Sequence, residues 1–162
     1  MRPSVIKYLN TVLKKHSFMG PIYEMGSLRV SGQEILADMR PYFPNQTFVG
    51  CDMRPGLGVD RIENVERLGL LNNSVGTVIC LDTLEHVEDV IQAMKEMYRV
   101  LKPGGLLVIT SVMNFCIHSY PSDYWRFTPM AFQFLLKPFS SKEVVYDGSR
   151  DFPTGIYGYG IK

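Results

Sequence analysis

The chain has 162 residues, with 17 lysine and arginine residues against 16 aspartate and glutamate residues. That length suffices for one domain with one hydrophobic core, and the balanced charge gives no electrostatic reason to expect a nucleic-acid binder. No apolar run approaches the roughly 20 residues of a membrane span, and no signal-peptide segment follows the first residues. We expect a single domain over residues 1–162.

The three cysteines indicate a reducing environment. Cys51, Cys80 and Cys116 are odd in number and widely spaced, so we expect no disulfide framework. Cys51 and Cys80 lie in apolar runs, where cysteine behaves as a small buried hydrophobe. We therefore expect a cytoplasmic protein.

The first half of the chain alternates helical patterns with short apolar strands. An N-terminal helix is predicted within residues 1–20, with Ser4 as its cap, and the first strand within residues 22–25. A capping box at Ser31–Glu34 predicts a second helix that ends before Pro44. The second strand is predicted at residues 47–51.

The second half continues the alternation. Strands are predicted at residues 77–81 and 106–110, separated by a helix whose apolar positions run from Val87 to Leu101 and which Lys102–Gly105 stops. Thr128 and Pro129 form the signature of a cap followed by proline at the first helical position. Two final strands are predicted near residues 143–146 and 156–161.

The hydrophobic pattern of the internal strands predicts the fold class. The four strands are continuous in hydrophobicity, which a sheet covered on both faces requires. Strands that alternate with helices imply right-handed crossovers. The sequence therefore predicts an α/β fold with a doubly wound, mostly parallel sheet.

Acidic residues follow three of the predicted strands. In such a sheet, ligands bind outside the carboxyl ends of the strands, where Glu24, Asp52 and Asp82 are expected. Three acids suit a ligand with hydroxyls, an amine or a positive centre better than a phosphate. Asp52 in particular offers acceptors for both hydroxyls of a ribose.

The first loop, residues 26–32, distinguishes between two candidate nucleoside cofactors. It lacks the glycine fingerprint that a dinucleotide needs for close approach to its pyrophosphate. S-adenosylmethionine has no phosphate, and its carboxylate can use amide groups near the helix start at Ser31. Glu24 or Asp82 is the candidate partner of its ammonium group.

Four segments then occur in the order seen in class I methyltransferases: Glu24–Ser27, Asp52, Asp82–Val87 and Arg99–Gly105. The chain resembles the type-11 methyltransferase group, which includes quinone methyltransferases. The resemblance implies a Rossmann-like methyltransferase fold with a C-terminal antiparallel hairpin, and the short segment between Asp52 and Thr77 indicates a reduced third-strand region. It also implies S-adenosylmethionine as the cofactor, bound at Gly26, Asp52 and Asp82. The further candidates for cofactor binding are Glu24, Ser27, Asn64 and Leu84.

The segment 112–128 is the candidate active-site loop. His118 is the preferred general base because imidazole titrates near neutral pH, and Tyr120 is a second catalytic candidate. Asp123, Tyr124 and Arg126 are candidates for orienting a polar acceptor. The alternative is that these side chains pack the loop, with Asp123 and Arg126 as a structural pair. His86 is interpreted as a cap or a donor to the backbone.

The sequence thus predicts methyl transfer to a small or medium-sized acceptor through oxygen, nitrogen or carbon. The irregular first loop keeps a second hypothesis open: a catalytically degenerate binding or regulatory module. A nicotinamide oxidoreductase is disfavoured by the missing fingerprint. No cluster has zinc-site spacing, so no metal is expected. Acceptor specificity is assigned to the N-terminal helix, the 112–128 loop or a second subunit of a homo-oligomer.

Overall fold

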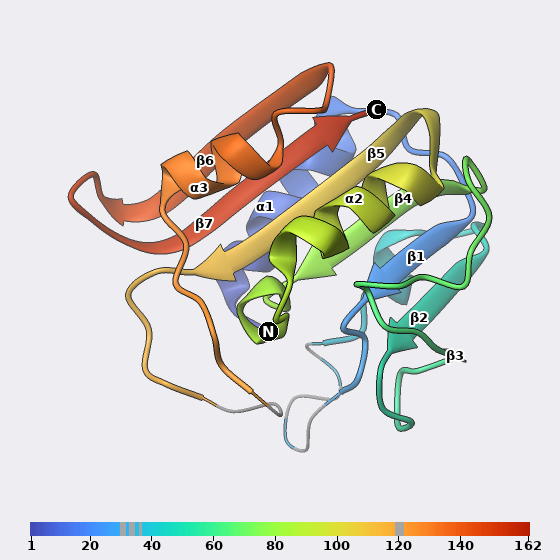
Figure 1. Cartoon of the computed structure of the whole chain (residues 1–162), viewed down its shortest axis with the longest axis horizontal. Coiled ribbons are helices and arrows are strands. Elements are labelled where there is room, and N and C mark those ends of the chain that lie inside the picture. The colour runs from blue at the N-terminus through green and yellow to red at the C-terminus, as the bar shows by residue number, and fades with distance from the viewer. Residues whose placement is uncertain (30–31, 33–34, 36, 119–121) are drawn as a thin grey trace.

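The computed structural model of the chain describes residues 1–29, 32, 35, 37–118 and 122–162. Within these residues, seven strands form one sheet in the order β3-β2-β1-β4-β5-β7-β6 (Figure 1). The first five strands are parallel, and β5, β7 and β6 pair antiparallel. The strands are β1 (Ile22–Met25), β2 (Phe48–Asp52), β3 (Arg61–Ile62), β4 (Val75–Leu81), β5 (Leu101–Val112), β6 (Ser141–Ser149) and β7 (Phe152–Ile161).

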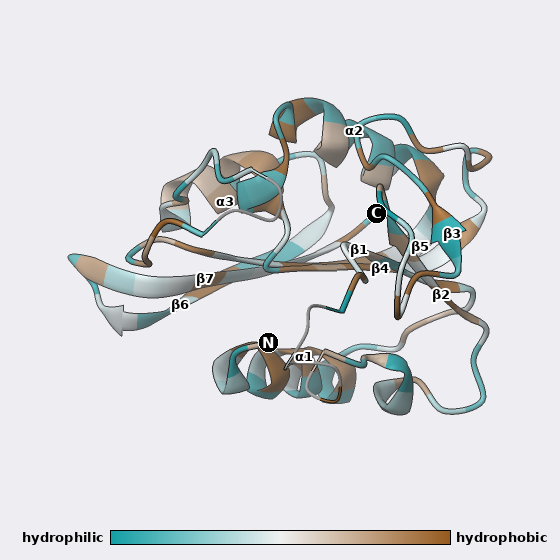
Figure 2. Ribbon diagram, turned by 90° about the horizontal axis from the view of Figure 1, so that it is seen from below, coloured by the Kyte–Doolittle hydropathy of each residue, from teal (hydrophilic) through white to brown (hydrophobic). Residues whose placement is uncertain are grey.

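Helices cover both faces of this sheet. Helix α1 (Pro3–Lys15) packs on one face, and helices α2 (Val90–Val100) and α3 (Pro129–Leu135) pack on the other (Figure 2). Two 3₁₀ helices, η1 (Arg40–Tyr42) and η2 (Leu84–His86), complete the described elements. The predicted doubly wound sheet with an antiparallel C-terminal hairpin is confirmed. Among the described helices, none has the length and apolar character needed to cross a membrane.

The core explains why the central strands read as unbroken apolar runs. Every residue of β4 is buried, because helices lie above and below it. Cys51 and Cys80 are buried within this sheet without a disulfide, as expected. The predicted third-strand region is reduced to the two residues of β3.

Two helix predictions need correction. The cap of α1 is Arg2 rather than Ser4, because Pro3 occupies the first helical position, and the Ser4 hydroxyl instead accepts a hydrogen bond from Tyr157 Oη at 2.9 Å. The capping box at Ser31–Glu34 lies mostly outside the described residues. Of the predicted second helix, the described positions form turns and η1, and Ile35 is 90% exposed. Pro41 disfavours helical geometry at the residue before it.

The predicted helix stop at residues 102–105 lies inside β5. Val75 of β4 pairs with Leu101, and Thr77 pairs with Leu106, so the four residues between bulge out of the ladder. Gly104 has a φ of +76°, which glycine adopts without steric cost. The bulge lets the chain leave α2 and enter the strand without a separate loop.

Candidate functional site

A cavity of about 670 Å³ opens at the carboxyl ends of β1, β2 and β4. This is the edge at which the sequence predicted ligand binding. Among the described residues, six carboxyl side chains and two arginines line it. The charged lining residues are Asp52, Glu63, Glu66, Asp82, Glu85, Glu88, Arg2 and Arg54. The cavity therefore favours a cationic ligand over an anionic one.

Gly26 forms the turn at the end of β1 and lines the cavity. Its φ is +81°, and an added Cβ would lie 2.2 Å from Thr83 Oγ1, so only glycine fits. Ser27 follows it, with its amide donating to the Cys51 carbonyl at 2.9 Å. The Ser27 side chain is buried and does not line the cavity, and its hydroxyl has no hydrogen-bond partner among the described residues.

Asp52 ends β2 and faces the cavity. Its side chain is 12% exposed, and its Oδ1 accepts a hydrogen bond from the Arg54 amide at 3.0 Å. Asn64 also lines the cavity, and its Oδ1 accepts from the Glu66 amide at 2.8 Å. Leu84, in contrast, is fully buried in the core and does not line the cavity. The structure thus brings Gly26, Asp52 and Asn64 together, and leaves Leu84 outside.

Asp82 ends β4 and is engaged by a residue that the sequence gave no reason to select. Arg2 donates two hydrogen bonds to its carboxylate, from Nε to Oδ2 at 3.0 Å and from Nη2 to Oδ1 at 2.7 Å. Thr110 Oγ1 donates to Oδ1 at 2.9 Å. Arg2 and Asp82 both line the cavity. Because 80 residues separate the pair, no local pattern could have indicated it.

Glu24 lies in β1, one residue before the cavity-lining Met25. It is 4% exposed and is not a lining residue. Burial raises the pKa of its carboxyl to about 8, although Arg40 and Arg29 oppose the rise. A direct contact between Glu24 and a ligand in the cavity has no support in this geometry.

The loop candidates divide into two groups. Tyr124 and His118 line the cavity, whereas Asp123 and Arg126 face a separate hollow of about 220 Å³. Arg126 binds the Asp123 carboxylate through Nη1 at 2.5 Å and Nη2 at 2.8 Å, and it also donates to the Cys116 carbonyl. This guanidinium holds the pKa of Asp123 well below its usual value. Asp123 and Arg126 therefore brace the loop, while Tyr120 lies outside the described residues.

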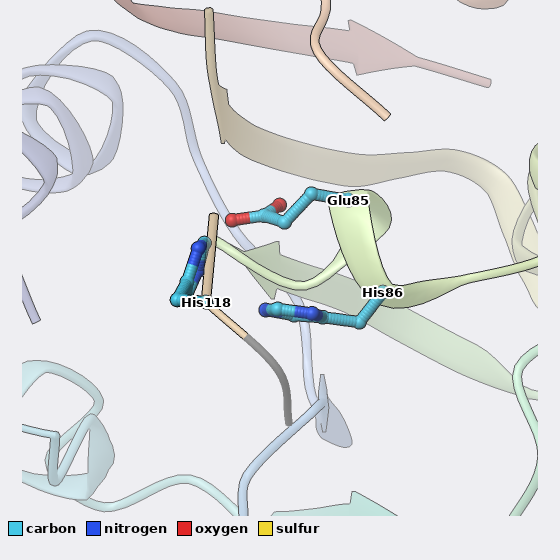
Figure 3. Close-up of side chains that lie close together, drawn as sticks. All are labelled: Glu85, His86 and His118. Carbon is cyan, nitrogen blue, oxygen red and sulfur yellow. The ribbon is translucent and has the colours of Figure 1, made fainter. Parts of the chain in front are cut away.

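Three potential metal ligands meet at the wall of the cavity. One donor atom from each of Glu85, His86 and His118 lies within 4.8 Å of the others, and the three side chains point toward one another (Figure 3). The two imidazole rings are 4.8 Å apart, edge to face. His86 Nδ1 donates to the Ser122 carbonyl, which agrees with its interpretation as a backbone donor. Burial lowers the pKa of His86 and so favours its neutral form.

Glu85 was not selected from the sequence as a site residue. Its side chain is 0% exposed, and its Oε2 accepts a hydrogen bond from Ser111 Oγ at 2.6 Å. Burial raises the pKa of the Glu85 carboxyl, and the nearby charge of Asp82 raises it further. The signal in the sequence was its place three residues after the strand-end acid Asp82, where the chain turns into η2.

Comparison with known proteins identifies similar chains. The sequence profile of the type-11 family described as "Methyltransferase domain" matches residues 29–109, half of the chain. The ubiquinone/menaquinone biosynthesis C-methyltransferase of Haemophilus ducreyi is 37% identical over 84 residues, covering 49% of this chain and 31% of that protein. The demethylmenaquinone methyltransferase of Listeria welshimeri is 31% identical over 94 residues, covering 56% and 40% respectively. The chain thus spans less than half the length of these relatives.

A solved structure shares the fold over the whole chain. The structure described as a SAM-dependent methyltransferase from Archaeoglobus fulgidus superimposes with a TM-score of 0.73 at 12% identity, covering 100% of this chain and 95% of that one. At this identity the likeness concerns the fold. It agrees with the strand order and the C-terminal hairpin described above.

Proposed function

Because the chain belongs to the type-11 methyltransferase domain family, we propose that it binds S-adenosylmethionine in the acid-lined cavity and methylates a small or medium-sized acceptor. The observation that carries the proposal is the position of the cavity, at the carboxyl ends of the parallel strands with Asp52 at its edge. The relatives' names support quinone-like acceptors, and the proposal covers oxygen, nitrogen and carbon as the methylated atom.

The residues around the cavity fit this cofactor. Gly26 lines the cavity at the end of β1 without a side chain, so its backbone is open to a ligand there. Asp52 offers carboxylate acceptors for ribose hydroxyls, and Asn64 offers an amide for the adenine edge. The excess of carboxylates suits a sulfonium and an ammonium group. When bound, the cofactor supplies a methyl group on a positively charged sulfur, which an acceptor atom takes by displacement.

On the acceptor side, the chain supplies His118 and Tyr124. A hydroxyl or amine acceptor loses a proton during methylation, and His118 is the cavity-lining candidate that assists this loss. Two routes are open to it: direct acceptance of the proton, and ligation of a cation that acidifies the acceptor. Tyr124 lines the same cavity, with its amide donating to the Glu85 carbonyl at 2.7 Å. Placement of the acceptor supplies a large part of the rate.

The Arg2–Asp82 pair supports a second candidate, a module that keeps the fold and the cofactor but has lost turnover. A guanidinium within the cavity occupies Asp82, an acid that the sequence had assigned to the cofactor, so the cavity departs from the expected set of cofactor contacts. Such a module binds S-adenosylmethionine without methylating any acceptor.

Calorimetric titration with S-adenosylmethionine and S-adenosylhomocysteine tests the proposal. We expect micromolar binding of both, followed by methyl incorporation from labelled cofactor in a screen of phenolic, amine and quinone-like acceptors. Binding with no product across the screen would favour the non-catalytic module. Absence of binding to a sample that unfolds cooperatively would overturn the cofactor assignment for both candidates.

A further inference from the structure

We propose that Glu85, His86 and His118 form a binding site for a divalent first-row transition metal at the wall of the cavity. The spacing of these residues along the chain gave no reason to expect a metal, because 32 positions separate His86 from His118. The fold brings Glu85 and His86, both in η2, beside His118 (Figure 3). The role given to the metal rests on the proposed methyl transfer.

The donor set is the first argument. Two imidazoles and one carboxylate are the ligands of several catalytic zinc sites, in which a fourth position stays open. Here the three donor atoms lie within 4.8 Å of one another. Ligand bonds of about 2.0–2.2 Å would draw them to about 3.5 Å apart, a shift that side-chain torsions can supply.

The buried carboxylate is the second argument. Glu85 is 0% exposed, yet its Oε1 has no hydrogen-bond partner among the described residues. A buried acceptor without a partner destabilises the folded state. Ser111 Oγ satisfies Oε2 at 2.6 Å and fixes the carboxylate in place. A cation at the cluster would satisfy Oε1.

Each imidazole is held by its other nitrogen, as metal-binding histidines are. His86 Nδ1 contacts the Ser122 carbonyl, and His118 Nδ1 lies 3.2 Å from the Cys116 carbonyl and 3.3 Å from Asp123 Oδ2. Because these oxygens only accept hydrogen bonds, the contacts place a proton on Nδ1 of each ring, and Nε2 is the nitrogen that would ligate the metal. The ion pair between Asp123 and Arg126 holds the Asp123 carboxylate in place, and this carboxylate orients His118 as a metal ligand.

The surroundings of the three ligands favour a bound cation and indicate its role in methyl transfer. The cavity wall carries an excess of carboxylates over arginines, six to two among the described lining residues. All three ligands line the cavity, so the open position of the metal faces the space for the acceptor. A hydroxyl oxygen of the acceptor bound there would become more acidic and would lose its proton to solvent. Its electron pair would then form the new bond to the methyl carbon as the bond from that carbon to the cofactor sulfur breaks, and the sulfur would keep that bond's electrons as a neutral thioether.

Cobalt titration of the metal-stripped full chain tests the site without cofactor or acceptor. We expect one Co²⁺ per chain, with visible absorption bands of four- or five-coordinate geometry that stoichiometric Zn²⁺ abolishes. Glu85→Gln and His118→Gln should each weaken cobalt binding by more than about tenfold. Loss of a group that only orients a metal ligand can already cause a tenfold change, so loss of a ligand should exceed it. Of the two variants, His118→Gln disturbs folding less, because the His118 side chain is 23% exposed.

Two matched controls give the test its specificity. His16→Gln removes the third histidine of the chain, which stacks on Tyr159 at 4.3 Å, and it should leave cobalt binding unchanged. Cys116→Ser removes the exposed thiol near His118 and should also leave it unchanged. Absence of stoichiometric binding, or equal binding by His118→Gln and His16→Gln, would overturn the metal site. Either result would leave the cofactor titration, and thus the proposed function, standing.

Discussion

Arg2 and Asp82 join the N-terminal helix to the carboxyl end of β4 through a two-point ion pair. The guanidinium donates from Nε and Nη2 to the two carboxylate oxygens at 3.0 and 2.7 Å, and Nη2 also donates to the Ser111 carbonyl at 3.2 Å. This planar arrangement is available to arginine and not to lysine. It fixes the residues that precede α1 at the cavity, where Met1 and Arg2 are lining residues.

Arg2→Gln should therefore change the cofactor preference. Removal of a positive charge from the cavity favours the cationic S-adenosylmethionine over the neutral S-adenosylhomocysteine, and we expect the ratio of their affinities to rise about fivefold, equal to about 1 kcal/mol. Calorimetry with both ligands measures this ratio. Lys15→Gln removes the same charge from the far end of α1, where Lys15 pairs with Glu143, and should leave the ratio unchanged. An unchanged affinity ratio in Arg2→Gln would show that the ion pair does not affect the choice between the two ligands.

Asp52→Ala should weaken S-adenosylmethionine binding by about 1–3 kcal/mol, the cost of leaving hydrogen-bonding groups of the ligand unpaired. Asp60→Ala is the matched control, because its carboxylate binds the Gly50 amide and Arg40 and does not line the cavity. Titration of both variants, after their thermal unfolding has been compared, measures the difference. Equal affinity in Asp52→Ala and the wild type would remove Asp52 from the site.

Gly26→Ala should lose both stability and cofactor affinity. A non-glycine residue at a positive φ costs about 1–3 kcal/mol, and here the new Cβ would also meet Thr83 Oγ1 at 2.2 Å. Gly104→Ala measures the backbone cost alone. Gly104 also has a positive φ, +76°, but an added Cβ there would contact only Met19 Cε, at 4.0 Å. Urea unfolding should show the larger loss in Gly26→Ala. A loss no larger than that of Gly104→Ala would contradict the close contact.

Glu24→Gln should make stability less dependent on pH. The pKa of Glu24 is raised from 4.5 to about 8 by burial, so between these values the folded protein holds a proton that the unfolded chain releases. The free energy of unfolding of the wild type must then fall as pH rises from about 4.5 to 8, by at most about 1.4 kcal/mol per pH unit from this group. Glutamine cannot release that proton.

Urea unfolding at several pH values measures the effect as the difference between wild type and Glu24→Gln. That difference should grow in favour of the variant from about pH 4.5 to about pH 8 and then level off. Glu143→Gln changes an exposed carboxylate that pairs with Lys15 and should follow the wild-type curve closely. A constant difference across this range would show that Glu24 stays ionised in the folded protein.

His118→Ala should spare cofactor affinity and slow turnover. His118 lines the cavity, but it lies on the loop rather than at the strand ends where Gly26 and Asp52 are placed. Loss of assistance in proton removal costs about 10²–10⁴-fold in rate. Single-turnover methyl transfer to an acceptor found in the screen measures it, with His16→Ala as the control. Wild-type turnover in His118→Ala would limit the residue to packing against Phe115 and His86.

The sequence by itself determined the order of the strands along the chain and the edge of the sheet at which the cavity lies. Unbroken apolar runs such as Val75–Leu81 have one stable placement, between two helical layers, and each strand-end residue then lies at one edge. Asp52 and Gly26 could be selected for this reason, since a strand-end acid and a glycine turn are local signals. The helix predicted before Pro44 is not formed at the described positions after residue 37, because Pro41 interrupts its apolar pattern.

Only the tertiary structure decided which side chains meet. Arg2 reaches Asp82 across 80 residues, and Glu85 meets His118 across 33, distances at which one sequence holds no periodic or spacing signal. Leu84 and Glu24 were assigned to the site from their neighbours in the chain, yet burial places both outside the cavity lining. Strand ends are set by local hydrophobicity, whereas the contacts of loops and termini depend on packing of the whole chain.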